Sequence, residues 1–220
     1  MTSLSDNLFD LAGRVAIITG GAGLLGRQHA EAIASFGGTP VIWDTNYRAA
    51  NEVAKSVGGL AFECDVTHPD HIHITMLNTL SATDRVDILV NNVSCNANVE
   101  SLGQLSRLEN FPYMQWEADL KLGLTSAFLC SKIIGGYMAK RGRGVIINIA
   151  SDLSVIAPDQ RLYRKEGLEE NEQPTKPISY SVVKHGIVGM TRYLAAYWAG
   201  KIRVNAISPG GVFNNQPDDF

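Results

Sequence analysis

The sequence is poor in cysteine and has little excess of either charge. Its 3 cysteines (Cys64, Cys95 and Cys130) are far apart and form no C-x-x-C pair, so we expect a reduced, cytoplasmic chain without disulfides. The net charge of -3 gives no positive field to attract nucleic acid or an anionic membrane. No apolar run leads us to expect a membrane-spanning helix, and the N-terminus lacks the basic and apolar segments of a signal peptide.

What the sequence does have is the composition and periodicity of one globular domain. Its 220 residues, 45% hydrophobic and 19% charged, suffice for a single core over 1–220. Short runs rich in Val and Ile alternate with longer segments of helical period. We expect strands at 14–19, 40–44, 60–65, 86–92, 144–151 and 202–208, and helices at 24–36, 46–57, 69–82, 111–141 and 179–199. This alternation predicts βαβ units and therefore an α/β fold with a three-layer, doubly wound parallel sheet.

Two features interrupt the alternation. Residues 152–177 are polar, contain 3 prolines and include the acidic run EGLEENE, so they form a long insertion between a strand and a helix. Loops of this length are usually functional or disordered. The sequence given stops soon after the sixth expected strand, where a further helix and edge strand would be expected. We therefore expect a sheet that lacks the final strand.

A glycine-rich stretch, TGGAGLLG at 19–26, joins the first expected strand to the first helix. It fits G-x-G-x-x-G through Gly21, Gly23 and Gly26, and it equally fits T-G-x-x-G-x-x-G, whereas T-G-x-x-x-G-x-G fails at Leu24. Glycine permits a sharp turn and lets a pyrophosphate approach the N–H groups at the start of the helix. The stretch predicts a dinucleotide-binding loop; the alternative is an ordinary strand–turn–helix junction.

An acidic residue, Asp44, ends the second expected strand. A carboxylate at this place accepts hydrogen bonds from the adenosine ribose hydroxyls and repels a 2′-phosphate. The glycine loop (19–26) contains no basic side chain, and the first basic residue after Asp44 is Arg48. This pattern favours NAD over NADP.

The segment YSVVK places Tyr180 and Lys184 on one face of the last helix. A nearby ammonium favours the phenolate form of a tyrosine, which makes the pair a candidate general acid–base. Ser151, at the end of the fifth strand, could polarise the same substrate oxygen. On spacing alone, a packed tyrosine beside a solvated lysine is the more common arrangement, because such pairs are frequent on helices. A second tyrosine, Tyr163, has Gly167 four residues on, and we interpret it as a substrate-side or surface residue.

Taken together, these stretches resemble the short-chain dehydrogenases/reductases, NAD(P)-dependent oxidoreductases with a Rossmann-like fold. The resemblance covers about 12–215. It is carried by TGGAGLLG, by WD with Asp44, and by CDV (64–66), DILVNN (87–92), NIAS (148–151), YSVVK (180–184) and RVNAISPGG (203–211).

The resemblance implies a role for each matching position. Ser151 would polarise the substrate oxygen, Tyr180 would be the acid–base, and Lys184 would hydrogen-bond the nicotinamide ribose. The positions expected to contact the cofactor, besides Tyr180 and Lys184, are Gly20, Gly21, Gly23, Leu24, Leu25, Gly26, Asp44, Asp65, Val66, Asn91, Pro209, Gly210 and Val212. Asp65 and Val66 would flank the adenine, and Asn91 would line the groove beside the adenosine half. The partners implied are a small-molecule substrate and further copies of the chain, as a homodimer or homotetramer.

The chain departs from the family pattern in two places. NNVS replaces the usual N-N-A-G, so Val93 and Ser94 put bulk where a small turn is normal. GLTSAF aligns with the family's N-L-x-G-x-F, so Gly123 stands where a proton-relay asparagine is expected.

The expected function is an NAD-dependent oxidoreductase that transfers hydride between nicotinamide and a secondary alcohol or ketone, for example on a sugar or sugar nucleotide. The T-G-x-x-G-x-x-G register is typical of nucleotide-sugar epimerases and dehydratases, whereas DILVNN and SPGG match the single-domain branch. Two alternatives stay open: an epimerase or dehydratase with tightly bound NAD, and a catalytically silent NAD-binding protein.

The histidine-rich segment THPDHIHI (67–74) could suggest a metal site. Only His68 and His71 would share a helix face, which leaves too few ligands for zinc, so we expect no metal. Thr67 and Asp70 instead fit a capping box at the start of a helix. We expect the fifth histidine, His185, to face the sheet or the cofactor edge.

Overall fold

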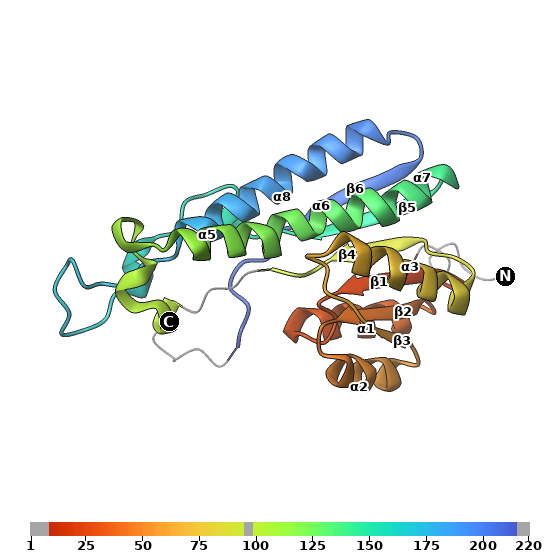
Figure 1. The fold of residues 1–220 in the computed structure, drawn as a ribbon, viewed down its shortest axis with the longest axis horizontal. Helices are drawn as coiled ribbons and strands as arrows, with labels where there is room; N and C mark the ends of the chain where they lie inside the picture. The colour runs from red at the N-terminus through yellow and green to blue at the C-terminus, as the bar shows by residue number, and fades with distance from the viewer. Residues whose placement is uncertain (1–8, 95–98, 215–220) are drawn as a thin grey trace.

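The computed structural model describes residues 9–94 and 99–214, and it confirms the expected α/β fold. Six strands form one sheet in the order β3-β2-β1-β4-β5-β6, and every neighbouring pair is parallel (Figure 1). The strands are β1 (Val15–Thr19), β2 (Thr39–Asp44), β3 (Leu60–Glu63), β4 (Ile88–Asn91), β5 (Gly144–Ile149) and β6 (Ile202–Ile207). The strand order reverses between β1 and β4, and this is where doubly wound sheets bind ligands.

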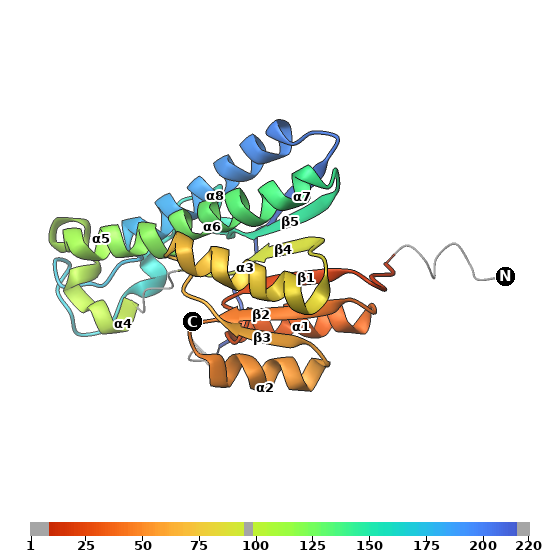
Figure 2. The ribbon, with the colours of Figure 1, turned by 45° about the vertical axis from the view of Figure 1, so that its right-hand side comes forward.

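Helices cover both faces of the sheet (Figures 1 and 2). One face packs against α1 (Leu24–Ser35) and α2 (Tyr47–Val57). The other packs against α3 (Pro69–Thr83), the helix formed by α5 (Tyr113–Leu120), α6 (Ser126–Cys130) and α7 (Gly136–Lys140), and α8 (Ile178–Tyr197). A short α4 (Val99–Leu102) and the 3-10 turns η1 (Gly103–Ser106), η2 (Leu108–Asn110), η5 (Asp152–Ser154) and η6 (Gln160–Tyr163) lie in the connections.

The long helix from Tyr113 to Lys140 differs from the expectation in two ways. Two π-helical turns, η3 (Lys121–Thr125) and η4 (Ser131–Gly135), interrupt its α-helical hydrogen bonding. It is also long and apolar enough to cross a membrane by length and composition, which the sequence reading did not anticipate. Its apolar residues Cys130, Ile134 and Met138 are buried in the core against the sheet, which is how the central helix of an α/β domain behaves.

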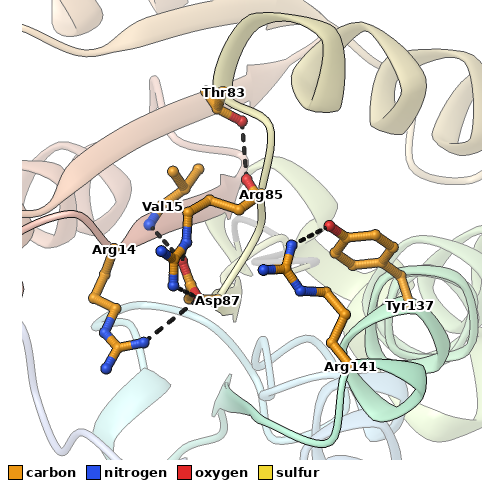
Figure 3. A network of polar contacts seen from close by, with 7 residues as sticks. All are labelled: Arg14, Val15, Thr83, Arg85, Asp87, Tyr137 and Arg141. Carbon is orange, nitrogen blue, oxygen red and sulfur yellow. Dashed lines mark hydrogen bonds and ion pairs between the residues drawn. The ribbon is translucent and has the colours of Figure 1, made fainter.

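A buried carboxylate, Asp87, joins the N-terminal ends of β1 and β4 (Figure 3). It accepts a hydrogen bond from the Val15 N–H at 3.0 Å and two from the Arg85 guanidinium at 2.7 and 2.6 Å. Arg14 lies 3.7 Å away. Burial alone raises the pKa of Asp87, but the hydrogen bonds and charges of Arg85, the Val15 N–H and Arg14 outweigh it, and the pKa lies below the ordinary value.

Asp87→Asn should lower the free energy of unfolding by about 2–4 kcal/mol, because it removes the charge that pairs with buried parts of Arg85. The folded-state pKa is depressed, so the stabilisation is complete above the ordinary carboxyl value of about 4 and disappears as pH falls through the lower folded-state value. Urea unfolding of both proteins from neutral to acidic pH measures this. Asp84→Asn, at an exposed neighbouring position, should change stability by less than about 0.5 kcal/mol. Equal losses in the two variants would contradict the assignment.

Candidate active site

The glycine loop after β1 has a different requirement at each glycine. Gly20 has a φ of +59°, in the left-handed region that favours glycine. A Cβ at Gly26 would lie 2.5 Å from the Gly20 carbonyl oxygen and 2.6 Å from the Gly21 Cα, so the close packing of α1 on the turn requires glycine there. A Cβ at Gly23 would meet only the Gly20 oxygen, at 3.3 Å. Packing within the protein therefore does not require glycine at position 23 as strictly as it does at position 26.

Hydrogen bonds between Asn92, which directly follows β4, and Thr19 at the end of β1 hold this loop. The Thr19 hydroxyl accepts the Asn92 N–H at 3.1 Å, and the Asn92 side-chain amide donates to the carbonyl oxygens of Thr19 and Gly20, both at 3.0 Å. The preceding residue, Asn91, points the other way. Its amide donates to the Ser131 hydroxyl at 3.0 Å and to the Asn148 oxygen at 2.8 Å, beneath the helix layer.

These contacts correct the expectation for Asn91, whose side chain is buried in the protein and does not line the groove described next. Residues along a strand alternate between its two faces, so a shift of one residue decides which asparagine reaches the edge. Asn92 occupies the place expected for Asn91, and the NN dipeptide alone could not distinguish them.

An open groove of about 380 Å³ runs along the C-terminal ends of the central strands. Its lining comes from the glycine loop, from the ends of β2, β3 and β4, and from the π turn η3: Gly20, Gly23, Leu24, Leu25, Asp44, Thr45, Cys64, Asp65, Val66, Asn92, Val93, Ser94 and Leu122. Most of the predicted adenosine-side residues are thus brought together. Gly21 and Gly26 support the turn from within the fold instead of lining the groove.

Asp44 lines this groove, and two hydrogen bonds hold its carboxylate. One oxygen accepts the Ala22 N–H at 3.1 Å, and the other accepts the Asn46 N–H at 3.0 Å. A carboxylate has about four lone-pair sites, so two hydrogen bonds leave capacity for ribose hydroxyls. The carboxylate therefore also ties the glycine loop to the end of β2.

Asp65 also lines the groove, shortly after β3. It accepts the Thr67 N–H at 2.9 Å and the Thr67 hydroxyl at 2.8 Å, and His68 lies 3.1 Å from its other oxygen. Partial burial raises the pKa of Asp65, but the bonds from Thr67 and the charge and hydrogen bond of His68 outweigh it and leave the pKa lowered. The expected capping box is wrong: the Thr67 hydroxyl bonds Asp65, and α3 starts at Pro69 with His68 as its N-cap and no side-chain cap.

The groove also contains a thiol that the sequence reading did not select. Cys64 follows β3 and is buried, and desolvation raises its pKa to about 11. Such a thiol stays protonated near neutral pH and is a poor nucleophile. Cys64 therefore lines the groove as a small, uncharged side chain.

The three expected catalytic side chains lie where β5 ends and α8 begins, since α8 packs against η5 directly after Ser151. Lys184 is 3% exposed, and its Nζ donates to the Ile149 carbonyl oxygen at 2.8 Å. The same Nζ lies 5.7 Å from the centroid of the Tyr180 ring. The Ser151 hydroxyl donates to the Asp152 carboxylate at 2.8 Å and accepts the Leu153 N–H at 3.2 Å.

Gly123 is buried within the π turn η3, and this turn packs against α8. The sequence indicated a departure at this position but not the change in helix type. Single π turns inside α-helices are frequent at functional sites. Here the turn also contributes Leu122 to the groove.

The segment after β6 reaches the Ser151 end of the site. The Pro209 carbonyl oxygen accepts the Asp152 N–H at 3.0 Å. Gly210 and Val212, which the resemblance places under the nicotinamide, are exposed and lie outside the groove of the adenosine half, and their contact with the cofactor stays a prediction. His185, expected to face the sheet or cofactor edge, is exposed, and its Nδ1 lies 2.9 Å from the Ser181 carbonyl oxygen, so that expectation is wrong.

Comparison with known proteins agrees with this arrangement. A family model described as enoyl-(acyl carrier protein) reductase matches residues 21–216. An NAD-dependent glycerol dehydrogenase of Listeria innocua is 32% identical over 208 residues, which cover 93% of this chain and 72% of that protein. The chain belongs to the short-chain dehydrogenase/reductase family. A D-threitol dehydrogenase of Mycolicibacterium smegmatis is 30% identical over 207 residues, which cover 91% of this chain and 71% of the relative.

Solved structures show the same family fold. The crystal structure of gox2181 has a TM-score of 0.79 at 26% identity and covers 91% of this chain and 73% of its own. Levodione reductase, at 24% identity, shares the fold with a TM-score of 0.77, covering 91% of this chain and 72% of its own. Because the relatives are named dehydrogenases and reductases of this family, the chain is an oxidoreductase.

Proposed function

We propose that this short-chain dehydrogenase/reductase is NAD-dependent and transfers hydride between nicotinamide and a secondary alcohol or ketone of a polyol or small sugar derivative. The observation that carries the proposal is that the Lys184 Nζ lies 5.7 Å from the centroid of the Tyr180 ring and donates to the Ile149 carbonyl oxygen, two residues before Ser151. The names of relatives that act on glycerol, threitol and a deoxygluconate derivative support polyols and sugar derivatives as the substrate class.

The groove fits a dinucleotide by its own geometry. The N-cap of α1 is Gly23, which offers no capping side chain, and the first turn of α1 contains no acidic residue. A pyrophosphate could therefore accept the N–H groups at this helix start. Gly23 itself lines the groove, and a Cβ there would meet only the Gly20 carbonyl oxygen, at 3.3 Å. NAD, when bound, would supply the hydride acceptor.

The chain's own residues would handle the proton. In alcohol oxidation, the Tyr180 phenolate would take the proton of the carbinol hydroxyl, and in ketone reduction the phenol would return it. The Lys184 ammonium would favour the phenolate. The Ser151 hydroxyl would exchange its bond to Asp152 for one to the substrate oxygen, which holds the carbinol in place.

Cofactor choice would depend on Asp44. Asp44→Asn keeps an acceptor for a backbone N–H but removes the negative charge. We expect kcat/KM for NAD+ to fall by about tenfold and discrimination against NADP+ to narrow by about tenfold, because the charged hydrogen bonds to ribose and the repulsion of a 2′-phosphate are both weakened. Steady-state rates with both cofactors measure this, and an unchanged cofactor ratio would contradict the role of Asp44.

A spectrophotometric screen of NAD+ and NADP+ against polyols, sugars and sugar nucleotides tests the proposal. The expected result is NADH formation with at least one polyol or sugar derivative, at a higher kcat/KM with NAD+ than with NADP+. Turnover only with NADP+, or only with sugar nucleotides and without net NADH, would overturn it. The second result would favour an epimerase or dehydratase.

A further inference from the structure

The 152–177 insertion brings a second ammonium group to Tyr180. The Lys176 Nζ lies 4.1 Å from the centroid of the Tyr180 ring, closer than the 5.7 Å of the Lys184 Nζ. Lys176 precedes α8 and stands four residues before Tyr180 in the chain. Two cations therefore face one phenol, one from its own helix and one from the insertion.

The insertion holds Lys176 in place through its backbone. The Lys176 N–H donates to the Gln160 side-chain oxygen at 2.8 Å, and the Gln160 amide nitrogen lies 3.5 Å from the Lys176 carbonyl oxygen. The neighbouring Thr175 is fixed to η1, with its N–H donating to the Ser106 hydroxyl at 2.8 Å and its hydroxyl to the Ser106 carbonyl oxygen at 2.9 Å. Pro177 follows and restricts the backbone further.

The remainder of the insertion is also structured. Gln173 is 7% exposed, and its side chain accepts the Lys165 N–H at 2.8 Å and donates to the carbonyl oxygens of Lys165 and Leu168 at 3.0 and 2.7 Å. Arg107 donates to the Glu170 carbonyl oxygen at 3.0 Å. Figure 2 shows the insertion beside the segment that includes α4. These hydrogen bonds fix the conformation of the insertion, and the insertion in turn positions Lys176.

The charges around Tyr180 come from several elements. Lys184 lies on α8, Lys176 on the insertion, and Tyr163 and Asp152 follow β5. Burial raises the pKa of Tyr163, and the charges of Tyr180 and Asp152 raise it further, so this phenol is neutral near pH 7. The charge of the Asp152 carboxylate acts on Tyr163, and this carboxylate accepts hydrogen bonds from the Ser151 hydroxyl and the Leu153 N–H.

We propose that Lys176 is a positioning residue that, together with Lys184, keeps Tyr180 in its phenolate form. An ammonium over an aromatic ring is attracted by the ring's electron density, and it gains more from a phenolate, whose negative charge extends into the ring. This role rests on the proposed function, in which Tyr180 is the acid–base. It gives the insertion a part in the reaction in addition to any effect on the shape of the substrate pocket.

Nuclear magnetic resonance of protein labelled with carbon-13 tyrosine tests the inference without any substrate. The chain has 7 tyrosines, and the signal absent from Tyr180→Phe identifies Tyr180. Following that signal against pH gives its ionisation midpoint. In Lys176→Met the midpoint should move up by about one pH unit, because one of two nearby positive charges is lost.

Two matched variants control the experiment. Lys176→Arg keeps the charge and should leave the midpoint within about 0.3 pH units of wild type. Lys165→Met makes the same substitution at another lysine of the insertion, and its midpoint should not move. A midpoint that is unchanged in a folded Lys176→Met protein would overturn the inference.

Kinetics adds a second readout once a substrate is found. The acid limb of kcat/KM for alcohol oxidation should move to higher pH in Lys176→Met by the same amount as the tyrosine signal. If instead KM alone rises, only for substrates with a carboxylate or phosphate, Lys176 binds substrate and the inference is wrong. A chain without turnover would contradict the proposed function, while the tyrosine titration would still decide the role of Lys176.

Discussion

Tyr180→Phe is expected to lower kcat by about 10²–10⁴-fold, because the variant loses the group that exchanges a proton with the substrate oxygen. The phenyl ring remains, so packing between the start of α8 and the insertion should persist. The groove of the adenosine half does not include Tyr180, and NADH affinity should therefore stay within about threefold of wild type. Steady-state kinetics and fluorescence titration of NADH measure the two effects separately.

Tyr163→Phe provides the matched control for this variant. This variant also removes a phenolic hydroxyl, but from Tyr163, whose pKa is raised by burial and by nearby negative charge. A neutral phenol of this kind is not suited to act as a base near pH 7. We expect its kcat to stay within about threefold of wild type. A wild-type rate in Tyr180→Phe together with a large loss in Tyr163→Phe would exchange the roles of the two residues.

The second large effect concerns the glycine loop. Gly26→Ala places a methyl group 2.5 Å from the Gly20 carbonyl oxygen and 2.6 Å from the Gly21 Cα. Both neighbours are backbone and cannot move without displacing the turn from β1. We expect the free energy of unfolding to fall by about 1–3 kcal/mol and NADH affinity to fall by at least about tenfold. Thermal unfolding and NADH titration test the two effects.

Gly23→Ala separates cofactor binding from folding. The new methyl group would meet only the Gly20 oxygen, at 3.3 Å, at a residue that lines the groove. We expect Tm to stay within about 2 °C of wild type and NADH affinity to fall by about tenfold or more. If Gly26→Ala binds NADH with wild-type affinity and unfolds at the wild-type Tm, the geometry described for the loop is wrong.

The fold could be predicted from the sequence because its elements have clear signals. Short Val- and Ile-rich runs mark β1, β2 and β4, which are largely buried, whereas β3 is only partly buried and β6 is buried at alternate residues. The helical period is clear in α8, where Ile187 and Leu194 are buried. The boundaries were less accurate at β4, which is shorter than expected because Val86 and Asp87 precede the ladder. Four expectations stay predictions: a single domain over 1–220, a cytoplasmic location, no binding of nucleic acid, and a homodimer or homotetramer.

The candidate site could be predicted only where a residue type is tied to a local spacing. The sequence located Tyr180 and Lys184 because one helical turn brings them together, and Asp44 because it ends a strand. It could not choose Asn92 over Asn91, because that depends on the face to which each strand residue points. Lys176 was missed because a bond from Gln160, 16 residues away in the chain, fixes it beside Tyr180.

The π turn at Gly123 was missed for a related reason. Over a segment as long as 113–140, the hydrophobic period does not distinguish a helix with π turns from a regular α-helix. Length and hydropathy alone would also fit a membrane-spanning helix. The packing of this helix against the sheet identifies it as a core helix.

The proposed reaction depends on hydride transfer from a carbinol carbon to NAD+. Incubation of the protein with NAD+ and glycerol or threitol carrying deuterium on the carbinol carbons, followed by mass measurement of the reduced cofactor, tests it most directly. We expect reduced cofactor with one deuterium per molecule, and almost none from Tyr180→Phe. Bound NAD+ that yields no deuterated reduced cofactor from any polyol or sugar derivative would rule out the proposed hydride transfer.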